Sequence, residues 1–266
     1  MTERAGQFSD LFARLITALI MAVIGLAAVW IGGGWFKLFV AVIVAVLIWE
    51  LVQMLGGESK RALSLGGFAA AVILISGYLP SGLGLSLPLL FLVAFAGVAA
   101  LERHRTLYMP LAMLIMLAAY GLIVHRDSFG LTWMLWLVLV VVATDILGYF
   151  AGRIFGGPKF WPAVSPKKTW SGTIAGWIGA GGVGAIFMVL TGAGVQVIGI
   201  SVALSMASQM GDIAESAVKR KMGVKDSSNL LPGHGGVFDR FDGMLGAAML
   251  LLIVESLTSF PPMPPL

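Results

Sequence analysis

The sequence predicts an all-α integral membrane protein that crosses the bilayer several times. Of its 266 residues, 59% are hydrophobic and 11% are charged, whereas a soluble domain usually carries about 25% charged residues. About nine apolar runs are long enough to cross a hydrocarbon core, which takes about 20 helical residues. Basic residues gather in alternate connections between these runs. We therefore expect a single membrane domain, residues 1–266, of about nine transmembrane helices.

The apolar runs follow one another with short connections rich in glycine, proline and serine. We place them at residues 15–31, 35–55, 63–80, 84–100, 107–125, 130–150, 172–192, 194–213 and 243–260. The first run is longer than the apolar region of a signal peptide, so we expect it to remain as a span. Residues 1–130 hold the N-terminal spans, and residues 131–266 hold the later spans with the loops that carry the candidate active site.

The distribution of lysine and arginine predicts the orientation, because cytoplasmic connections are enriched in these residues. With the N-terminus inside, only Lys37 and Arg126 of the 17 basic residues fall on the outer side. An odd number of spans then places the C-terminus, with its proline-rich tail, on the outer side. The net charge is +4, but the distribution of the charges is more informative than their sum, and we expect no nucleic-acid partner. The absence of cysteine excludes disulfides, thiolate catalysis and cysteine metal sites.

Two inner connections, residues 152–171 and 211–242, are richer in charge than orientation requires. Asp145 lies just before the first of them, near the inner end of a span, where an ionised carboxylate is costly unless paired or hydrated. Two interpretations stay open: an ion pair with Arg153 or Lys168 that holds helices together, or the wall of a polar cavity. Lys167 and Lys168 could likewise set topology and attract anionic lipid headgroups, or bind phosphate.

The second connection begins as an extension of the span at 194–213, which we expect to continue beyond the membrane as a helix. Residues three and four apart share a helical face. One polar stripe therefore combines Ser208, Asp212, Glu215 or Ser216, and Lys219. A stripe that begins at membrane depth and runs into the cytoplasm is what a lipid headgroup site needs.

A glycine-rich turn, residues 232–236, then precedes a new helix that we expect near Val237. Such turns bind anions through backbone N–H groups and the helix dipole. Asp239 and Asp242 would share a face of this helix, and carboxylates beside a phosphate require a cation. Ligands that are all oxygen favour Mg²⁺ or Mn²⁺ over Zn²⁺. His234 either contributes to the function of this site or is only a turn residue that is hydrogen-bonded to the backbone.

These residues resemble the signature of the phosphatidate cytidylyltransferases, also called CDP-diacylglycerol synthases. The similarity lies in Ser216-x-x-Lys219-Arg220, Lys225-Asp226 and Gly233-His234-Gly235-Gly236-x-x-Asp239-Arg240-x-Asp242, together with Ser165-Pro166-Lys167-Lys168-Thr169 and the stretch 144–153. The N-terminal half agrees only as a set of spans. One departure is Ser171, where members of the family often carry glutamate.

The resemblance implies that CTP and phosphatidic acid give CDP-diacylglycerol and pyrophosphate in a bacterial cytoplasmic membrane, with the active site facing the cytoplasm. It also implies a homodimer, and Asp212 and Asp239 as ligands of Mg²⁺ in a site that can also hold a monovalent cation. The lipid phosphate is already an anion, so catalysis should consist of positioning and charge neutralisation. We assign catalytic or cation-binding roles to Asp212, Asp239, Lys219, Asp226 and His234. Substrate contacts or their support fall to Lys167, Lys168, Ser216, Arg220, Lys225, Gly235, Gly236, Arg240, Asp242, Asp145 and Arg153.

Two other functions remain as alternatives. A CTP-dependent polyprenol kinase would use a neutral alcohol as nucleophile and would need a base such as Asp226 or His234. A membrane transporter would also place acidic residues within spans, but transporter sites usually lie near the midplane on broken helices. Here the polar residues collect at the inner ends of the spans.

Overall fold

A computed structural model describes residues 2–80 and 83–261, with side chains described over 16–80 and 84–261. The side chains of Arg4 and Arg14, the predicted turn at Ser81-Gly82 and the proline-rich tail beyond Pro261 lie outside the described residues.

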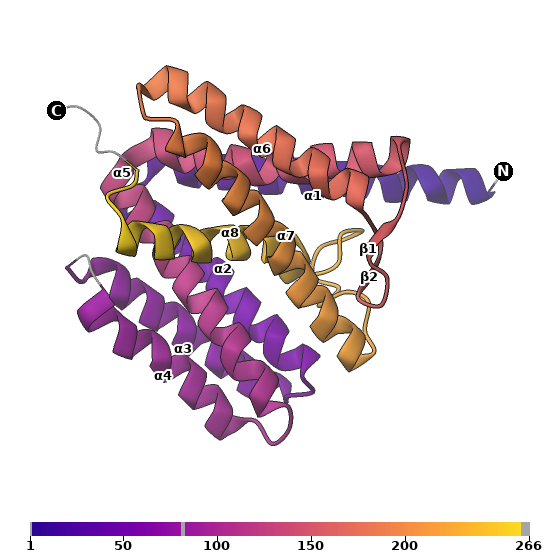
Figure 1. Cartoon of the computed structure of the whole chain (residues 1–266). Coiled ribbons are helices and arrows are strands. Elements are labelled where there is room, and N and C mark those ends of the chain that lie inside the picture. Colours follow the sequence, from indigo (N-terminus) through magenta and orange to yellow (C-terminus); the bar gives the residue numbers. More distant parts are fainter. Residues whose placement is uncertain (1, 81–82, 262–266) are drawn as a thin grey trace. The chain divides into compact units, whose positions relative to one another are not determined.

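The structure confirms an all-α, membrane-like fold in which every predicted apolar run lies on a helix (Figure 1). The helices are α1 (Thr2–Ile31), α2 (Gly33–Met54), α3 (Ser59–Tyr78), α4 (Leu83–Ala100), α5 (Arg105–Ile154), α6 (Trp170–Thr191), α7 (Gln196–Met222) and α8 (Phe238–Leu257). Five of the described helices, α2, α3, α5, α6 and α7, are long and apolar enough to cross a membrane. Shorter apolar stretches occupy Ile16–Ile31 of α1 and Gly84–Ala100 of α4.

Helix α5 has 50 residues and contains two predicted runs, 107–125 and 130–150. Its helical geometry is interrupted at Gly130, where φ is 77° and ψ is −166°. Glycine adopts this left-handed backbone at little steric cost because it lacks a Cβ. The interruption falls at the boundary that the hydrophobicity pattern predicts between the two runs.

The connection between α5 and α6 contains a small antiparallel hairpin that the sequence analysis did not predict. Its strands are β1 (Lys159–Trp161) and β2 (Ser165–Thr169). Aromatic packing supports it, with the rings of Phe160 and Trp170 centred 4.7 Å apart. The hairpin matters for the site because Lys167 and Lys168 lie on β2, directly before α6 (Figure 1).

The chain forms two compact units. The first unit comprises residues 1–112 and 222–240, and the second comprises residues 113–221 and 241–266. In the first unit, α2 packs against α1 and α3, and α3 packs against α4. The connection before α8 therefore packs with the N-terminal helices.

Within the second unit, glycines allow α7 and α8 to cross closely. A Cβ on Gly211 of α7 would lie 2.3 Å from the carbonyl oxygen of Asp242, and one on Gly246 of α8 would lie 2.1 Å from that of Ala207. Small residues let membrane helices approach in this way. The crossing places Asp212, the neighbour of Gly211, beside Asp242 of α8.

Candidate active site

The second unit contains a polar cavity of about 580 Å³ formed by α5, β2, the start of α6, and α7. Its walls carry both basic and acidic side chains. They consist of Thr144, Asp145, Gly148, Tyr149, Gly152, Arg153, Lys167, Lys168, Thr169, Gly172, Thr173, Gln209 and Asp212. The cavity thus joins the predicted residues of the first charged connection to Asp212 of the second, and it favours the interpretation of Asp145 as part of a cavity wall.

Lys168 is the link between the two predicted groups. Its Nζ lies 2.5 Å from Oδ2 of Asp212 and donates a longer hydrogen bond, 3.4 Å, to the carbonyl oxygen of Gln209. The other oxygen of Asp212 accepts a hydrogen bond of 3.1 Å from Ser216 Oγ. Across the cavity, Arg153 Nη1 donates to Tyr149 Oη at 2.8 Å. Lys168 is therefore held by Asp212.

The polar stripe on α7 is confirmed, because the helix continues without interruption to Met222. Ser216 bonds to Asp212 one turn before it, and Lys219 Nζ lies 2.5 Å from Glu215 Oε2. Glu215 and Ser208 are both about 1% exposed, whereas Arg220 lies on the exposed face. The stripe thus presents a buried acidic and basic pair next to the cavity residue Asp212.

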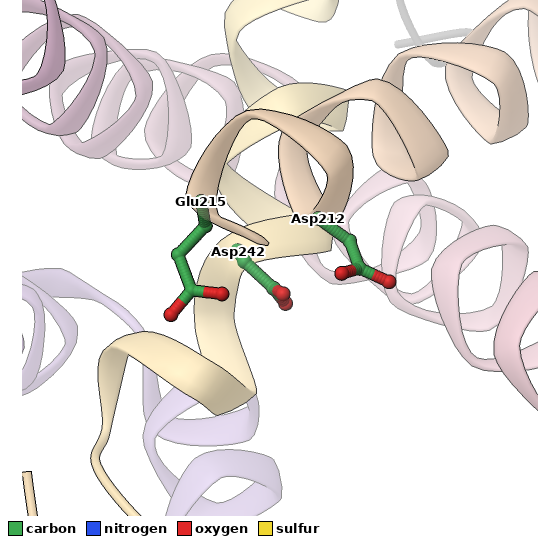
Figure 2. A group of neighbouring side chains, drawn as sticks. All are labelled: Asp212, Glu215 and Asp242. Atoms are coloured by element: carbon green, nitrogen blue, oxygen red, sulfur yellow. The ribbon is translucent and has the colours of Figure 1, made fainter. Parts of the chain in front are cut away.

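Three carboxylates gather where α7 meets α8. Figure 2 shows Asp212 and Glu215 on one helix, with Asp242 of α8 between them. Ligand oxygens of the three lie within 4.8 Å of one another. Asp242 directly precedes the apolar segment 243–260. Burial is the main cause that raises the pKa of this carboxyl to about 7, and the negative charge of Asp212 is the second. An oxygen-only cluster in which like charges repel fits a hard divalent cation such as Mg²⁺.

The first unit contains the other predicted loop, residues 222–237, and α8 begins at Phe238, as expected. We expected the N–H groups of this turn to be open to an anion, and the structure differs. The N–H groups of Val237 and Phe238 donate to the two carboxylate oxygens of Glu50, at 2.9 and 2.7 Å. That of Gly236 donates to Asp239 Oδ2 at 2.8 Å. Helix N-termini attract anions, and here carboxylates of the protein itself occupy that position.

Asp239 and His234 shape this loop. Oδ2 of Asp239 accepts hydrogen bonds from the N–H of Ser227 at 2.9 Å and from its hydroxyl at 3.0 Å, besides that of Gly236. The carbonyl oxygen of His234 accepts a hydrogen bond from Arg240 Nη2 at 2.8 Å. The imidazole Nδ1 of His234 lies 3.4 Å from the carbonyl oxygen of Pro232. His234 thus fits the description of a turn residue bonded to backbone.

Other predicted residues lie at the exposed edge of the loop or outside the acidic cluster. Lys225 and Asp226 are exposed in the first unit. A left-handed backbone at Gly235, φ 81°, turns the chain back toward α8. Among the described residues, the acidic cluster contains Glu215 and Asp242 beside Asp212. Asp239 lies in the first turn of α8, where its Oδ2 accepts hydrogen bonds from the loop.

Ser171 has a defined structural role at the position where the family often carries glutamate. Its Oγ lies 2.5 Å from the carbonyl oxygen of Gly156, to which it donates, and 3.0 Å from Thr169 Oγ1. These bonds connect the start of α6 to the chain that leaves α5. The serine therefore fixes the base of the hairpin that carries the cavity lysines.

Sequence reasoning missed two residues. Gln209 lines the cavity, accepts a hydrogen bond from Trp177 Nε1 at 3.0 Å, and donates to the carbonyl oxygen of Thr173 at 3.2 Å. Glu50, which binds the start of α8, was visible as an acidic residue inside the apolar run 35–55, and such residues are functional candidates by default. For Gln209, no pattern distinguishes it from an ordinary polar residue in a span.

Comparison with known proteins identifies the family of this chain. The profile of the cytidylyltransferase family matches residues 12–258. A phosphatidate cytidylyltransferase of Brucella suis biovar 1 is 38% identical over 264 residues, which cover 96% of this chain and 97% of the relative. A protein of the same name from Staphylococcus saprophyticus is 33% identical over 91% of this chain and 97% of the relative. One from Bacillus subtilis is 30% identical over 94% of this chain and 99% of the relative. The chain therefore belongs to the cytidylyltransferase family.

Proposed function

We propose that this protein is a phosphatidate cytidylyltransferase that converts CTP and phosphatidic acid to CDP-diacylglycerol and pyrophosphate. The observation that carries the proposal is the cavity in which Lys167, Lys168 and Arg153 meet Asp212. A site for two phosphate-bearing substrates needs basic groups for their charge and carboxylates for a cation. The names of the relatives support the same substrates.

The reaction requires one bond to form and one to break. A phosphate oxygen of phosphatidic acid attacks the α-phosphorus of CTP, and the bond from that phosphorus to the bridging oxygen of the β-phosphate breaks as pyrophosphate leaves. Since the nucleophile is already an anion, the chain needs no general base. Lys167, Lys168 and Arg153 neutralise and orient the phosphates, and such positioning supplies much of the catalysis in phosphoryl-type transfers.

The acidic cluster fits Mg²⁺ or Mn²⁺ because its ligand atoms are all carboxylate oxygens. Asp212 and Asp242, with Glu215 behind them, would hold the cation, with or without a monovalent cation nearby. When bound, it supplies charge neutralisation on the triphosphate and polarises the attacked phosphorus. Asp239 remains a second candidate ligand on the strength of the family resemblance, although its Oδ2 already accepts bonds from the loop.

The orientation and setting of the protein are part of the proposal. A bacterial cytoplasmic membrane, nine spans, an inner N-terminus and an outer C-terminus explain why only Lys37 and Arg126 of the 17 basic residues would face outward. The interruption of α5 at Gly130 supports counting that helix as two spans. A homodimer in the membrane is a further expectation from the resemblance.

The test is product analysis with purified protein, CTP, Mg²⁺ and either phosphatidic acid or a polyprenol. Radiolabelled CTP identifies which part of the nucleotide reaches the lipid. A CDP-lipid with released pyrophosphate supports the proposal, whereas CDP with a phosphorylated polyprenol would identify a kinase. Absence of both products, with CTP bound or not, would favour the transporter alternative. Lys60→Ala, an exposed cytoplasmic substitution outside the charged loops, serves as the matched control.

A further inference from the structure

A carboxylate of the first unit accepts hydrogen bonds from four donors. Glu50 of α2 is 0% exposed. Its Oε1 accepts from Ser228 Oγ at 2.6 Å and from the N–H of Val237 at 2.9 Å. Its Oε2 accepts from the N–H of Phe238 at 2.7 Å and from Ser227 Oγ at 3.2 Å. All of these residues belong to the first unit.

This arrangement saturates the carboxylate. An ionised carboxylate offers about four acceptor positions, and four donors surround Glu50. The hydroxyl of Ser227 also lies 3.0 Å from Asp239 Oδ2, so its single proton is shared between the two acids. The two N–H groups from the start of α8 add the favourable field of a helix N-terminus. Glu50 therefore engages the loop with both of its carboxylate oxygens.

The loop is built around Glu50. A Cβ on Gly236 would lie 2.6 Å from Glu50 Oε1 and 2.0 Å from Ser227 Oγ. Any larger residue at this position would therefore displace the side chains of Glu50 and Ser227. Gly236 in turn donates its N–H to Asp239. The glycine in the predicted signature is thus required by a carboxylate of α2, which lies far from it in the sequence.

We propose that Glu50 is a positioning residue for the reaction. Its carboxylate fixes residues 227–238 in one conformation, and through that loop it fixes the arrangement of Asp239, His234 and Arg240. The inference rests on the proposed function, because it assigns to the loop a part in the reaction. It extends the functional set into the N-terminal half, where the sequence resemblance offers only spans.

The test is Glu50→Gln in the full-length protein, purified in detergent. Glutamine has the same size, but whichever way its amide turns, the NH₂ faces the N–H of Val237 or of Phe238, and neither can accept a hydrogen bond. We expect kcat per folded enzyme to fall about ten- to a hundredfold, the range for residues that orient catalytic groups. Amide hydrogen exchange at residues 236–238 should accelerate at least tenfold, with α2 and α3 still protected. Glu50→Asp, which keeps the charge, should retain more activity than Glu50→Gln.

The matched control is Glu102→Gln, the same change at an exposed carboxylate of the first unit that pairs with Arg61. It should leave both readouts unchanged. If Glu50→Gln does not fold, Ser228→Ala removes one donor and should lower kcat about two- to fivefold with faster exchange in the loop.

Wild-type kcat in the folded variant, or unchanged exchange at residues 236–238, would overturn the proposal. So would a loss of protection throughout α2 and α3, since Glu50 would then serve stability alone. Synthesis of CDP-lipid by the wild-type protein in the same preparation reports separately on the proposed function.

Discussion

The cavity of the second unit and the loop of the first unit use carboxylates in opposite ways. Asp212 has a side chain 36% exposed and is held by side chains, the ammonium of Lys168 and the hydroxyl of Ser216. Glu50 is fully buried and is held by two backbone N–H groups and two serine hydroxyls. Side-chain partners can rearrange when a cation or phosphate arrives, whereas backbone partners cannot move without refolding the loop. We therefore expect the cavity to bind ligands and the loop to control conformation.

Asp212→Asn tests the cavity side of this comparison and should have the largest effect. The amide cannot neutralise Lys168 and is a much weaker ligand for a cation. We expect turnover to fall by about a hundredfold to a thousandfold, as for the loss of a main electrostatic group. Formation of CDP-lipid from CTP and phosphatidic acid, measured over a Mg²⁺ titration, is the readout. Near-normal activity would remove Asp212 from the cation site, and activity independent of divalent cation would contradict the mechanism.

Asp242→Asn and Asp239→Asn separate the cation cluster from the loop. Loss of a ligand should raise the Mg²⁺ concentration for half-maximal activity, so we expect about a ten- to hundredfold rise for Asp242→Asn. Asp239→Asn should lower kcat over a similar range, with that Mg²⁺ concentration unchanged, because Oδ2 of Asp239 serves the loop. An equal rise in both variants would instead identify Asp239 as a ligand, as the family resemblance implies.

Substitutions of Lys167 and Lys168 test whether the cavity lysines bind phosphate or only set orientation. Removal of a charge-assisted contact worth about 1.5–3 kcal/mol should make each alanine variant about ten- to a hundredfold slower. Arginine should also lower the rate, since a planar guanidinium does not replace a compact ammonium at a fitted site. Topology should not change in either case.

Lys60 is the control for these lysine variants. Arg61 is unsuitable as a control because it binds Glu58, Glu102 and the carbonyl oxygen of Ala100. If Lys60 and the cavity lysines respond alike to the same changes, β2 is a topogenic segment and the phosphate site is confined to α7 and α8.

Single cysteines test whether the cavity and the loop face the same side, with little expected effect on activity. The chain has no cysteine of its own, so each label reports one position. Ala163→Cys in the hairpin and Asn229→Cys in the loop, both at exposed positions, should react with an impermeant maleimide only after the membrane is opened. Val195→Cys should react in intact cells. A label at Ala163 from outside would reverse the orientation that the basic residues predict.

Helix positions and the polar stripe could be predicted from the sequence because each depends on local pattern. The run 172–192 became α6 over Trp170–Thr191, and α7 continues past its span as the polar spacing indicates. The break in α5 coincides with the predicted gap at Gly130. Hydrophobic length and helical period are properties of neighbouring residues, so no tertiary information is needed.

Contacts between residues far apart in the sequence could not be predicted. The hairpin depends on the contact between Phe160 and Trp170, and the acidic cluster depends on the crossing at Gly211. The glycine-rich turn was interpreted as an open anion site because its N–H groups are visible in sequence, whereas their acceptor, Glu50, is not. Propensity and residue spacing indicate which donors and acceptors a segment carries, and only tertiary packing decides which groups they bond to.

The sequence separation of Glu50 from its donors, 177 to 188 residues, has a consequence for biosynthesis. At about 5–20 residues per second, Glu50 leaves the ribosome roughly 10–40 s before the segment that will surround it. During that interval the carboxyl group needs water as its hydrogen-bond partner, because burying a polar group without partners is costly. The partners of Glu50 thus become available only after residue 238 has been made, and a chain arrested before residue 227 would leave this carboxylate without any of the four.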